Sequence, residues 1–143
     1  MKIMSPAFRN HAKIPEKYTC DGDNVNPPLD FDDFPKETKQ LALIVDDPDA
    51  PGKTFVHWLV YNMPLSVHID EDSVPATQGY NDFGRQSYGG PCPPSGEHRY
   101  FFKLYALDTK LDLAEGVNKA KLESAMEGHV LEKADLIGLY SRT

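Results

Sequence analysis

The sequence predicts a mainly β protein with a few helices, in one domain that spans residues 1–143. Its 12 prolines and 10 glycines divide the chain into short segments, because these two residue types concentrate in turns. The segments between them are rich in β-branched and aromatic residues and often alternate between apolar and polar, which is typical of strands. With 40% hydrophobic residues, the chain has enough apolar side chains for one core.

Five segments carry the strand pattern. The three clearest are 41–47, 57–63 and 99–107, and two weaker ones are 2–5 and 136–141. In the segment 99–107, apolar side chains occupy both of the faces that alternate along a strand. A strand that is covered on both faces is expected in the middle of a sheet.

One helix is predicted towards the C-terminal end of the chain. Asn118 is a good residue to cap its N-terminus. The apolar residues after this cap recur at steps of three and four, as expected for a face packed on the core: Leu122, Ala125, Met126 and Val130. Gly128 weakens a helix by about 1 kcal/mol relative to Ala, so we expect the helix to bend or break there.

Two loops stand out. The segment 20–33 holds five aspartates and no basic residue, which favours a solvated surface and also suits a basic partner. The segment 79–96 is rich in Gly and Pro, and a loop of that length is uncommon in a compact domain unless it has a function.

The chain is acidic, with 15 Lys and Arg residues against 22 Asp and Glu residues and a formal net charge of −7. Its basic residues are dispersed along the chain, so no nucleic-acid partner is expected. No apolar run approaches the roughly 20 residues that cross a bilayer, and the N-terminal residues lack the apolar region of a secretory signal. We therefore expect a cytoplasmic protein without an integral membrane segment.

The two cysteines, Cys20 and Cys92, are too far apart for a redox CxxC motif and too few for a zinc site made of cysteines. Two alternatives stay open at this point, namely reduced thiols or a single disulfide.

Polar residues that suit a binding site fall where the predicted strands meet loops. Asp47 ends one strand, His57 begins the next, and His98 and Tyr100 share a face of the third, because residues two apart in a strand point the same way. If these strands are neighbours, the four side chains converge at one end of a sheet. Arg99 points the opposite way from His98, and an ion pair with Asp46 or Asp49 would account for it.

Each of these residues also has an ordinary structural interpretation. A histidine at the start of a strand commonly bonds to a carbonyl group, a tyrosine such as Tyr100 is commonly a core residue with a bonded hydroxyl, and the Pro-rich segment 46–51 is a turn signal without any chemistry. The combination of His57, His98 and Tyr100 with Asp47 is what favours a functional site. We also expect a cis proline bond in the turn 47–51, since a sharp bend would present Asp47 beside His57.

The motifs of this chain resemble those of the phosphatidylethanolamine-binding protein family. Two motifs in the same order and spacing carry the resemblance, namely the DPDxP and GxHR signatures. The chain is most similar to the short prokaryotic YbhB/YbcL branch, whose members are called Raf-kinase-inhibitor-like proteins. The matching segments are DDPDAP at 46–51, HWLVYNM at 57–63 and GPCPPSGEHRY at 90–100, with YTCDG at 18–22, NPPL at 26–29 and the closing segment 128–140.

This resemblance implies a large central, mostly antiparallel sheet packed on a smaller sheet, with a C-terminal helix. It also implies a small anion-binding pocket at one end of the sheet for phosphate, a phosphorylated head group such as phosphoethanolamine, or a carboxylate. The ligand-binding residues that it assigns are Asp47, His57, Gly90, Pro91, His98 and Tyr100. Imidazole, phenol and backbone N–H groups of the Gly-rich loop are donors suited to such oxygens.

In this chain a cysteine, Cys92, stands where the eukaryotic pattern usually has a proline, which fits the prokaryotic branch. We also expect the helix that borders the pocket at the C-terminal end of eukaryotic members to have no counterpart here. For this reason, and because the commonest oligomer is a twofold dimer, we expect a homodimer.

The function that we expect from the sequence is therefore non-catalytic binding of a small anion, with no cofactor and no metal, and with inhibition of a kinase or protease as the role implied by the family. One alternative is a hydrolase or lyase that uses the cluster of Asp47, His57 and His98. Another is an inhibitor that acts on proteins through its surface loops.

Overall fold

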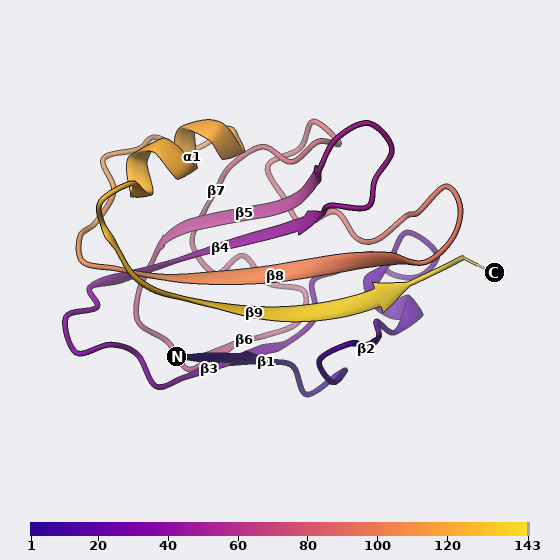
Figure 1. Cartoon of the computed structure of the whole chain (residues 1–143), viewed down its shortest axis with the longest axis horizontal. Helices are drawn as coiled ribbons and strands as arrows, with labels where there is room; N and C mark the ends of the chain where they lie inside the picture. Colours follow the sequence, from indigo (N-terminus) through magenta and orange to yellow (C-terminus); the bar gives the residue numbers. More distant parts are fainter. Residues whose placement is uncertain (143) are drawn as a thin grey trace.

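The computed structural model describes residues 1–142, and its architecture is mostly β, as the sequence predicts (Figure 1). The element order begins with β1 (Lys2–Met4), β2 (Ala12–Lys13), the 3₁₀ turn η1 (Glu16–Tyr18), β3 (Leu29–Asp32), β4 (Gln40–Asp47) and β5 (Phe55–Met63). It continues with β6 (His68–Ile69), β7 (Thr77–Gln78), β8 (His98–Leu107), the helix α1 (Lys119–Met126) and β9 (Val130–Tyr140).

The strands form two sheets. The larger one has six strands in the order β2-β9-β8-β4-β5-β7, and the smaller one has three in the order β1-β3-β6. The four long strands, β4, β5, β8 and β9, pair antiparallel with one another, whereas the short β2 pairs parallel with β9. β8 lies between β4 and β9, which confirms its predicted place inside a sheet, and β4 lies between β5 and β8. The end of β4 therefore meets the beginnings of β5 and β8, and this adjacency positions the site.

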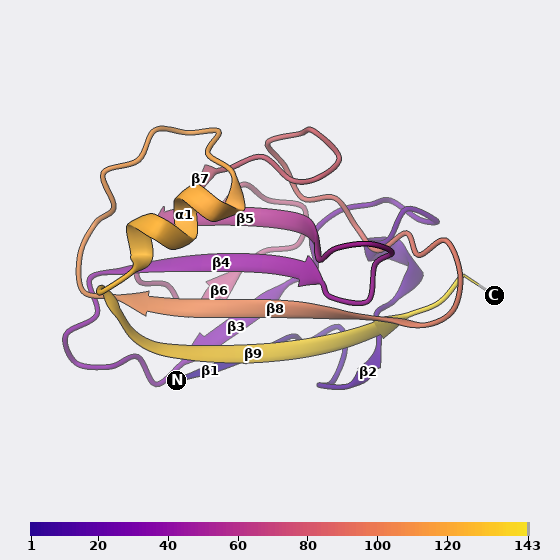
Figure 2. The ribbon, with the colours of Figure 1, turned by 45° about the horizontal axis from the view of Figure 1, so that its top comes forward.

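The core has two parts, one on each face of the larger sheet. The first packs that sheet on the smaller one, through side chains such as Trp58, Phe102 and Phe31. The second packs the opposite face under α1, where Leu122 and Met126 of the helix are buried. Figure 2 shows α1 lying across β4 and β5 on its own face of the sheet. The molecule is thus a helix layer, a large sheet and a small sheet, in that order.

The structure confirms the predicted start of the helix and shows that the helix ends earlier than the apolar pattern indicated. The Asn118 side chain accepts a hydrogen bond from the Lys121 backbone N–H, which caps α1 as expected. The helix ends at Met126, and Gly128 adopts a φ of 82° that only glycine tolerates easily. Including Val130 in the helical face is therefore wrong, because this residue already begins β9, six residues before the predicted strand 136–141.

The prediction of a cis proline bond in the turn 47–51 is also wrong, because no peptide bond among the described residues is cis. The sharp bend is produced by a side chain instead. Asp47 Oδ1 accepts a hydrogen bond of 2.8 Å from the Asp49 backbone N–H, which is the turn that Asp and Asn side chains favour.

Candidate functional site

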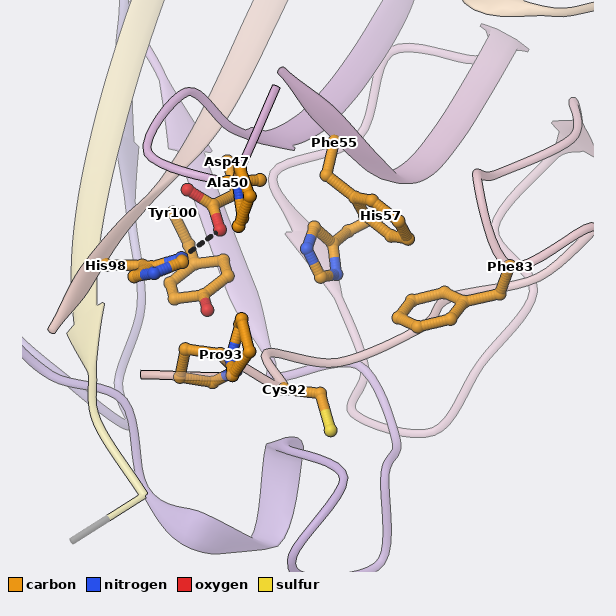
Figure 3. Close-up of a pocket in the computed structure, with 11 residues that line it drawn as sticks. Asp47, Ala50, Phe55, His57, Phe83, Cys92, Pro93, His98 and Tyr100 are labelled. Atoms are coloured by element: carbon orange, nitrogen blue, oxygen red, sulfur yellow. Dashed lines mark hydrogen bonds and ion pairs between the residues drawn. The ribbon is translucent and has the colours of Figure 1, made fainter. Parts of the chain in front are cut away.

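A cavity of about 310 Å³ opens where β4 ends and β5 and β8 begin (Figure 3). Its polar residues come from these three strands, and its apolar walls come from the turn after β4 and from the loop 79–96. The cavity is lined by Asp47, Ala50, Pro51, Phe55, His57, Phe83, Cys92, Pro93, Pro94, His98 and Tyr100. The long Gly- and Pro-rich loop 79–96 thus contributes four of the lining residues, namely Phe83, Cys92, Pro93 and Pro94.

The structure brings together four of the six residues that the sequence assigns to the site, namely Asp47, His57, His98 and Tyr100. Gly90 and Pro91 do not line this cavity. Gly90 lines a neighbouring cavity of about 250 Å³, and its backbone N–H donates to the Asn24 side chain at 2.8 Å. The Gly89 backbone N–H donates to the His57 carbonyl oxygen. The two glycine N–H groups are thus already bonded within the protein.

Sequence reasoning missed the aromatic wall of the cavity. The rings of Phe55 and Phe83 lie 4.8 Å apart, and each packs against the imidazole of His57, at 5.0 and 5.5 Å between ring centroids. Phe55 could have been found, because it lies two residues before His57 on the same face of β5. Phe83 carries no local signal, since it lies in a loop that only the tertiary structure places beside β5.

Asp47 and His98 form a buried pair at one side of the cavity. His98 Nδ1 lies 2.6 Å from Asp47 Oδ2, and His98 Nε2 lies 3.1 Å from the carbonyl oxygen of Ser95. A carbonyl can only accept, so Nε2 carries a hydrogen. The contact at Nδ1 is then either an imidazolium with a carboxylate or a neutral imidazole with a carboxylic acid. In both forms the pair as a whole carries no net charge.

His57 lies on the other side of the cavity and is 3% exposed. Its Nδ1 donates to the Gly89 carbonyl oxygen at 2.7 Å, which is the ordinary contact of a histidine at a strand start. Burial lowers the pKa of His57 below its usual 6.5, although the Gly89 carbonyl and the Asp47 charge act in the opposite direction. The free nitrogen, Nε2, faces the side of the cavity that holds Asp47 and Tyr100 (Figure 3).

Tyr100 lies between the two histidines. Its ring packs edge-on against His57 at 5.2 Å and is roughly parallel to His98 at 6.4 Å. The side chain is 1% exposed, yet within residues 1–142 its hydroxyl group has no hydrogen-bond partner. Burial raises the pKa of Tyr100 well above its usual value, so the group stays a neutral O–H donor.

The rim of the cavity is held by an ion pair between Arg99 and Asp49. The guanidinium group donates twice to the carboxylate, with both distances at 2.9 Å, and the Arg99 backbone N–H adds a third bond. These bonds lower the pKa of Asp49 to about 2. Of the two acidic partners considered for Arg99, the structure selects Asp49. Asp46 bonds instead to Lys103 and Lys119, each at 2.9 Å, on the face that carries α1.

Two further observations concern what the site and the fold lack within residues 1–142. No group of three His, Cys, Asp or Glu side chains is placed to hold a metal ion. No helix in this part of the chain has the length and apolar character needed to span a membrane.

The comparison with known proteins agrees with this fold and these motifs. The family model described as phosphatidylethanolamine-binding protein matches residues 4–141. The chain belongs to this family. Among phosphatidylethanolamine-binding proteins of known structure, it is similar to the putative homologue CT736 from Chlamydia trachomatis, with a TM-score of 0.96 and 42% identity over 99% of this chain and 97% of that one. It is also similar to Escherichia coli YbcL, with a TM-score of 0.92 and 28% identity over 99% and 98% of the two chains.

Curated relatives match almost the whole of this chain. A UPF0098 protein from Methanothermobacter thermautotrophicus is 53% identical to it over 99% of each chain. The UPF0098 protein PH1269 from Pyrococcus horikoshii is 47% identical over 97% of this chain and 76% of its own length. The resemblance seen in the sequence is thereby confirmed, and membership of the family supports a ligand-binding role of the same type.

Proposed function

We propose that this protein binds a small ligand through an anionic phosphate or carboxylate group, non-covalently and without turning it over. The observation that carries the proposal is the buried hydroxyl group of Tyr100, which has no partner within residues 1–142 and belongs to a ring that packs edge-on against His57. A buried donor without a partner costs about 1–3 kcal/mol. A ligand oxygen that accepts this hydrogen bond would recover that cost.

The free nitrogen of His57 determines the protonation state in which an anion is bound. Because Nδ1 donates to Gly89, Nε2 of the neutral ring presents a lone pair to the cavity. An anionic oxygen repels that lone pair unless a proton lies between them. The site therefore takes up the anion together with one proton, either on His57 or on the ligand as a P–OH or carboxylic acid group.

The Asp47–His98 pair removes an objection to anion binding that the sequence raises. A free carboxylate in the cavity would repel a phosphate, but both Asp47 oxygens are bonded, one to His98 and the other to the Asp49 backbone. The pair is neutral as a unit, so the ligand needs no ammonium group to offset Asp47. Both nitrogens of His98 are also bonded, so His98 acts mainly by holding Asp47.

The apolar walls of the cavity determine which organic group the ligand carries beside its phosphate or carboxylate. Phe55, Phe83 and Pro93 surround the polar floor, and apolar or weakly polar groups fit such walls because their burial is favourable. A small phosphate monoester or carboxylate with a short organic substituent suits both parts of the cavity. Inhibition of a kinase or protease and a homodimer stay predictions that the family resemblance motivates, and light scattering in the micromolar range tests the dimer.

The test is calorimetric titration with inorganic phosphate, phosphoethanolamine and acetate at pH 5.5 and 7.5. We expect tighter binding at pH 5.5, and an observed enthalpy that changes with the ionisation enthalpy of the buffer, because a proton is taken up. His57→Ala should weaken binding by about 1.5–3 kcal/mol, the range for hydrogen bonds to charged groups, and Tyr100→Phe by a similar amount.

Two matched variants serve as controls. Tyr105→Phe removes a hydroxyl group from the same strand outside the cavity, and His129→Ala removes a half-buried histidine that pairs with Asp108. Both should bind like the wild type. Equal affinity of Tyr100→Phe and wild type would contradict the proposed site. A phosphate-release assay with phosphoethanolamine distinguishes the enzyme alternative, since steady turnover that His57→Ala abolishes would place the protein among hydrolases.

A further inference from the structure

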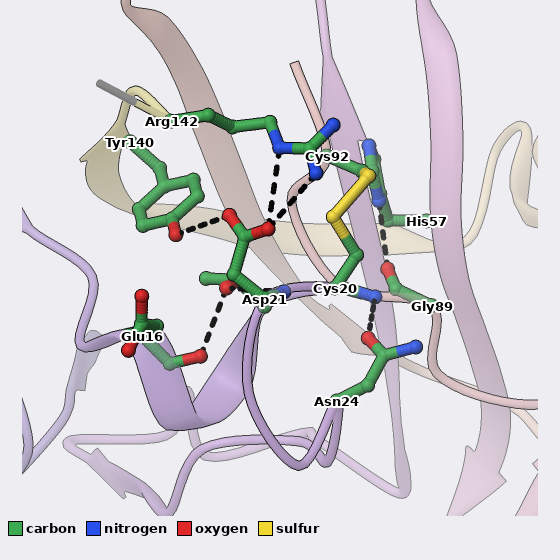
Figure 4. The surroundings of a disulfide bond; sticks show 11 residues. Glu16, Cys20, Asp21, Asn24, His57, Gly89, Cys92, Tyr140 and Arg142 are labelled. Carbon is green, nitrogen blue, oxygen red and sulfur yellow. Dashed lines mark hydrogen bonds and ion pairs between the residues drawn. A yellow bond between two sulfur atoms is a disulfide. The ribbon is translucent and has the colours of Figure 1, made fainter. Parts of the chain in front are cut away.

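The two cysteines form a disulfide, which joins two segments that are 72 residues apart in the sequence. Cys92 lines the ligand cavity, whereas Cys20 lines the neighbouring cavity of about 250 Å³. Phe83 lines both cavities, so the bridge and this ring lie at the wall between them. Figure 4 shows the bridge joining the segment of Cys20 to the segment of Cys92. The bond is therefore part of the wall of the proposed site.

The segment 88–94, which carries this wall, has no regular secondary structure. Three of its residues, Pro91, Pro93 and Pro94, have no N–H group to contribute to a ladder. The segment is held by two hydrogen bonds between Gly89 and His57 and by contacts with residues 18–24, which are the end of a 3₁₀ turn and the loop after it.

Few contacts join these two segments besides the bridge. The Tyr88 hydroxyl donates to the Tyr18 carbonyl, the Gly90 N–H donates to Asn24, and the Cys20 N–H donates to the Pro91 carbonyl. A Cβ atom on Gly90 would lie 2.4 Å from the Tyr18 carbonyl oxygen. The two segments therefore approach each other this closely only because residue 90 is a glycine. The covalent bond between Cys20 and Cys92 then holds them at this separation.

The same segment positions the ligand-binding histidine. The Gly89 carbonyl accepts from His57 Nδ1 at 2.7 Å and thereby sets which nitrogen faces the cavity. Gly89 lies three residues before Cys92. Opening the disulfide frees Cys92, and this change reaches the hydrogen bond that orients His57 through only three peptide units.

We propose that the Cys20–Cys92 disulfide is a redox control of the ligand site, in which the oxidised protein holds the wall of the cavity in place and the reduced protein binds the ligand more weakly. This inference rests on the proposed function, because it concerns the same cavity. Both cysteines are half-buried, and Cys92 borders an open cavity, so the bridge is accessible to a small dithiol or to the active site of a dithiol reductant.

The reaction is an ordinary thiol–disulfide exchange with a dithiol. A thiolate of the reductant attacks one sulfur of the bridge and forms a mixed disulfide, and the other cysteine leaves as a thiolate that takes up a proton. The second thiol of the reductant then displaces the remaining cysteine, which is protonated in turn. Cys20 and Cys92 gain two electrons and two protons, and the dithiol becomes a disulfide.

Once the bridge is open, the wall must be ordered when the ligand binds. Fixing one or two residues reduces affinity by about tenfold, which is the effect that we expect for reduction. Linkage is reciprocal, so a ligand that binds the oxidised form tenfold more tightly makes the reduction potential of the bridge about 30 mV more negative at saturation.

The test compares oxidised and reduced wild-type protein in titrations with phosphoethanolamine and inorganic phosphate, with dithiothreitol as the reductant. Affinity should fall about tenfold on reduction, by the ordering cost above, and should return on reoxidation. The double variant Cys20→Ala and Cys92→Ala should bind like the reduced protein and should not respond to dithiothreitol. Equal affinity of the oxidised and reduced forms would overturn the redox control and leave the proposed function intact.

A second measurement does not depend on the ligand. The pKa of His57, followed by NMR, should rise towards its usual value on reduction, because water enters and relieves the burial that lowers it, which outweighs the loosening of the Gly89 bond that raises it. Trp58, the single tryptophan, packs on Tyr88 at 5.5 Å, so its fluorescence should change as well. If the oxidised protein binds neither phosphoethanolamine nor inorganic phosphate, the proposed function fails. The His57 pKa and the Trp58 fluorescence then still show whether the disulfide controls the structure of the cavity wall. The proposed redox control would be overturned by unchanged His57 and Trp58 signals, or by global unfolding on reduction, which circular dichroism detects.

Discussion

Asp47 Oδ2 lies 2.6 Å from His98 Nδ1, inside the protein, although the two residues are 51 positions apart in the sequence. Their side chains are 4% and 8% exposed. Because the opposite nitrogen of His98 is held by the Ser95 carbonyl, the imidazole ring is fixed on both sides. This arrangement makes the pair a rigid floor for the cavity, while His57 and Tyr100 keep the groups that are free to meet a ligand.

The first prediction concerns this pair. Asp47→Ala and His98→Ala should each lower the free energy of unfolding, because each leaves a buried polar partner without its bond. The double variant should lose less than the sum of the two, with a coupling free energy of about 1.5–3 kcal/mol. Urea unfolding of the four proteins measures this coupling. Additive losses would mean that the two side chains act independently.

The second prediction concerns Asp49 and pH. Its pKa is about 2 in the folded protein, below the usual 3.8, because Arg99 stabilises the carboxylate. The stabilisation is therefore present above pH 3.8 and is lost as the pH falls through about 2. Arg99 is half exposed, so screening by solvent limits the contribution to below about 1 kcal/mol. Stability curves of wild type and Asp49→Asn should converge in acid, and added salt should reduce their difference at neutral pH. A constant gap at all pH values would contradict this.

The third prediction concerns His57. Burial lowers its pKa below 6.5, so the unfolded chain takes up a proton before the folded protein does. Above pH 6.5 the ring is neutral in both the folded and the unfolded protein, so it does not reduce stability there. The free energy of unfolding falls as the pH drops from 6.5 towards the lower pKa of the folded protein. An NMR titration should find the lowered pKa in the free protein and a higher value with saturating phosphate. His57→Gln should remove this part of the pH dependence. A pKa at or above 6.5 in the free protein would be inconsistent with the buried, neutral ring.

The fourth prediction concerns the effect of the disulfide on stability. The bridge closes a long loop, with a sequence separation of 72, and restricting a loop of that size in the unfolded chain stabilises a fold by about 4 kcal/mol. The double variant Cys20→Ser and Cys92→Ser should lose about this much and remain folded at 25 °C. Chemical denaturation measures the loss. A change below about 1 kcal/mol would indicate that restriction of this loop in the unfolded chain does not stabilise the fold as expected.

Much of the fold was predictable from local patterns. The β-branched and aromatic residues along 41–47, 57–63 and 99–107 predicted strands within two residues of those observed, since these residue types fit the packed faces of a sheet. The start of β9 was not predictable in this way. Four of its first residues are exposed, so hydrogen bonding to β8, and not burial, makes them a strand.

What the sequence by itself determined is which residues could meet at the site. Asp47 at a strand end, His57 at a strand start, and His98 with Tyr100 two positions later fix four side chains relative to their own strands, because backbone geometry sets where each one points. The tertiary structure alone decided which partners they find. The Asp47–His98 bond, the turn of His57 towards Gly89 and the disulfide all join segments distant in the chain. Such contacts depend on how strands and loops pack together, and no local pattern encodes that.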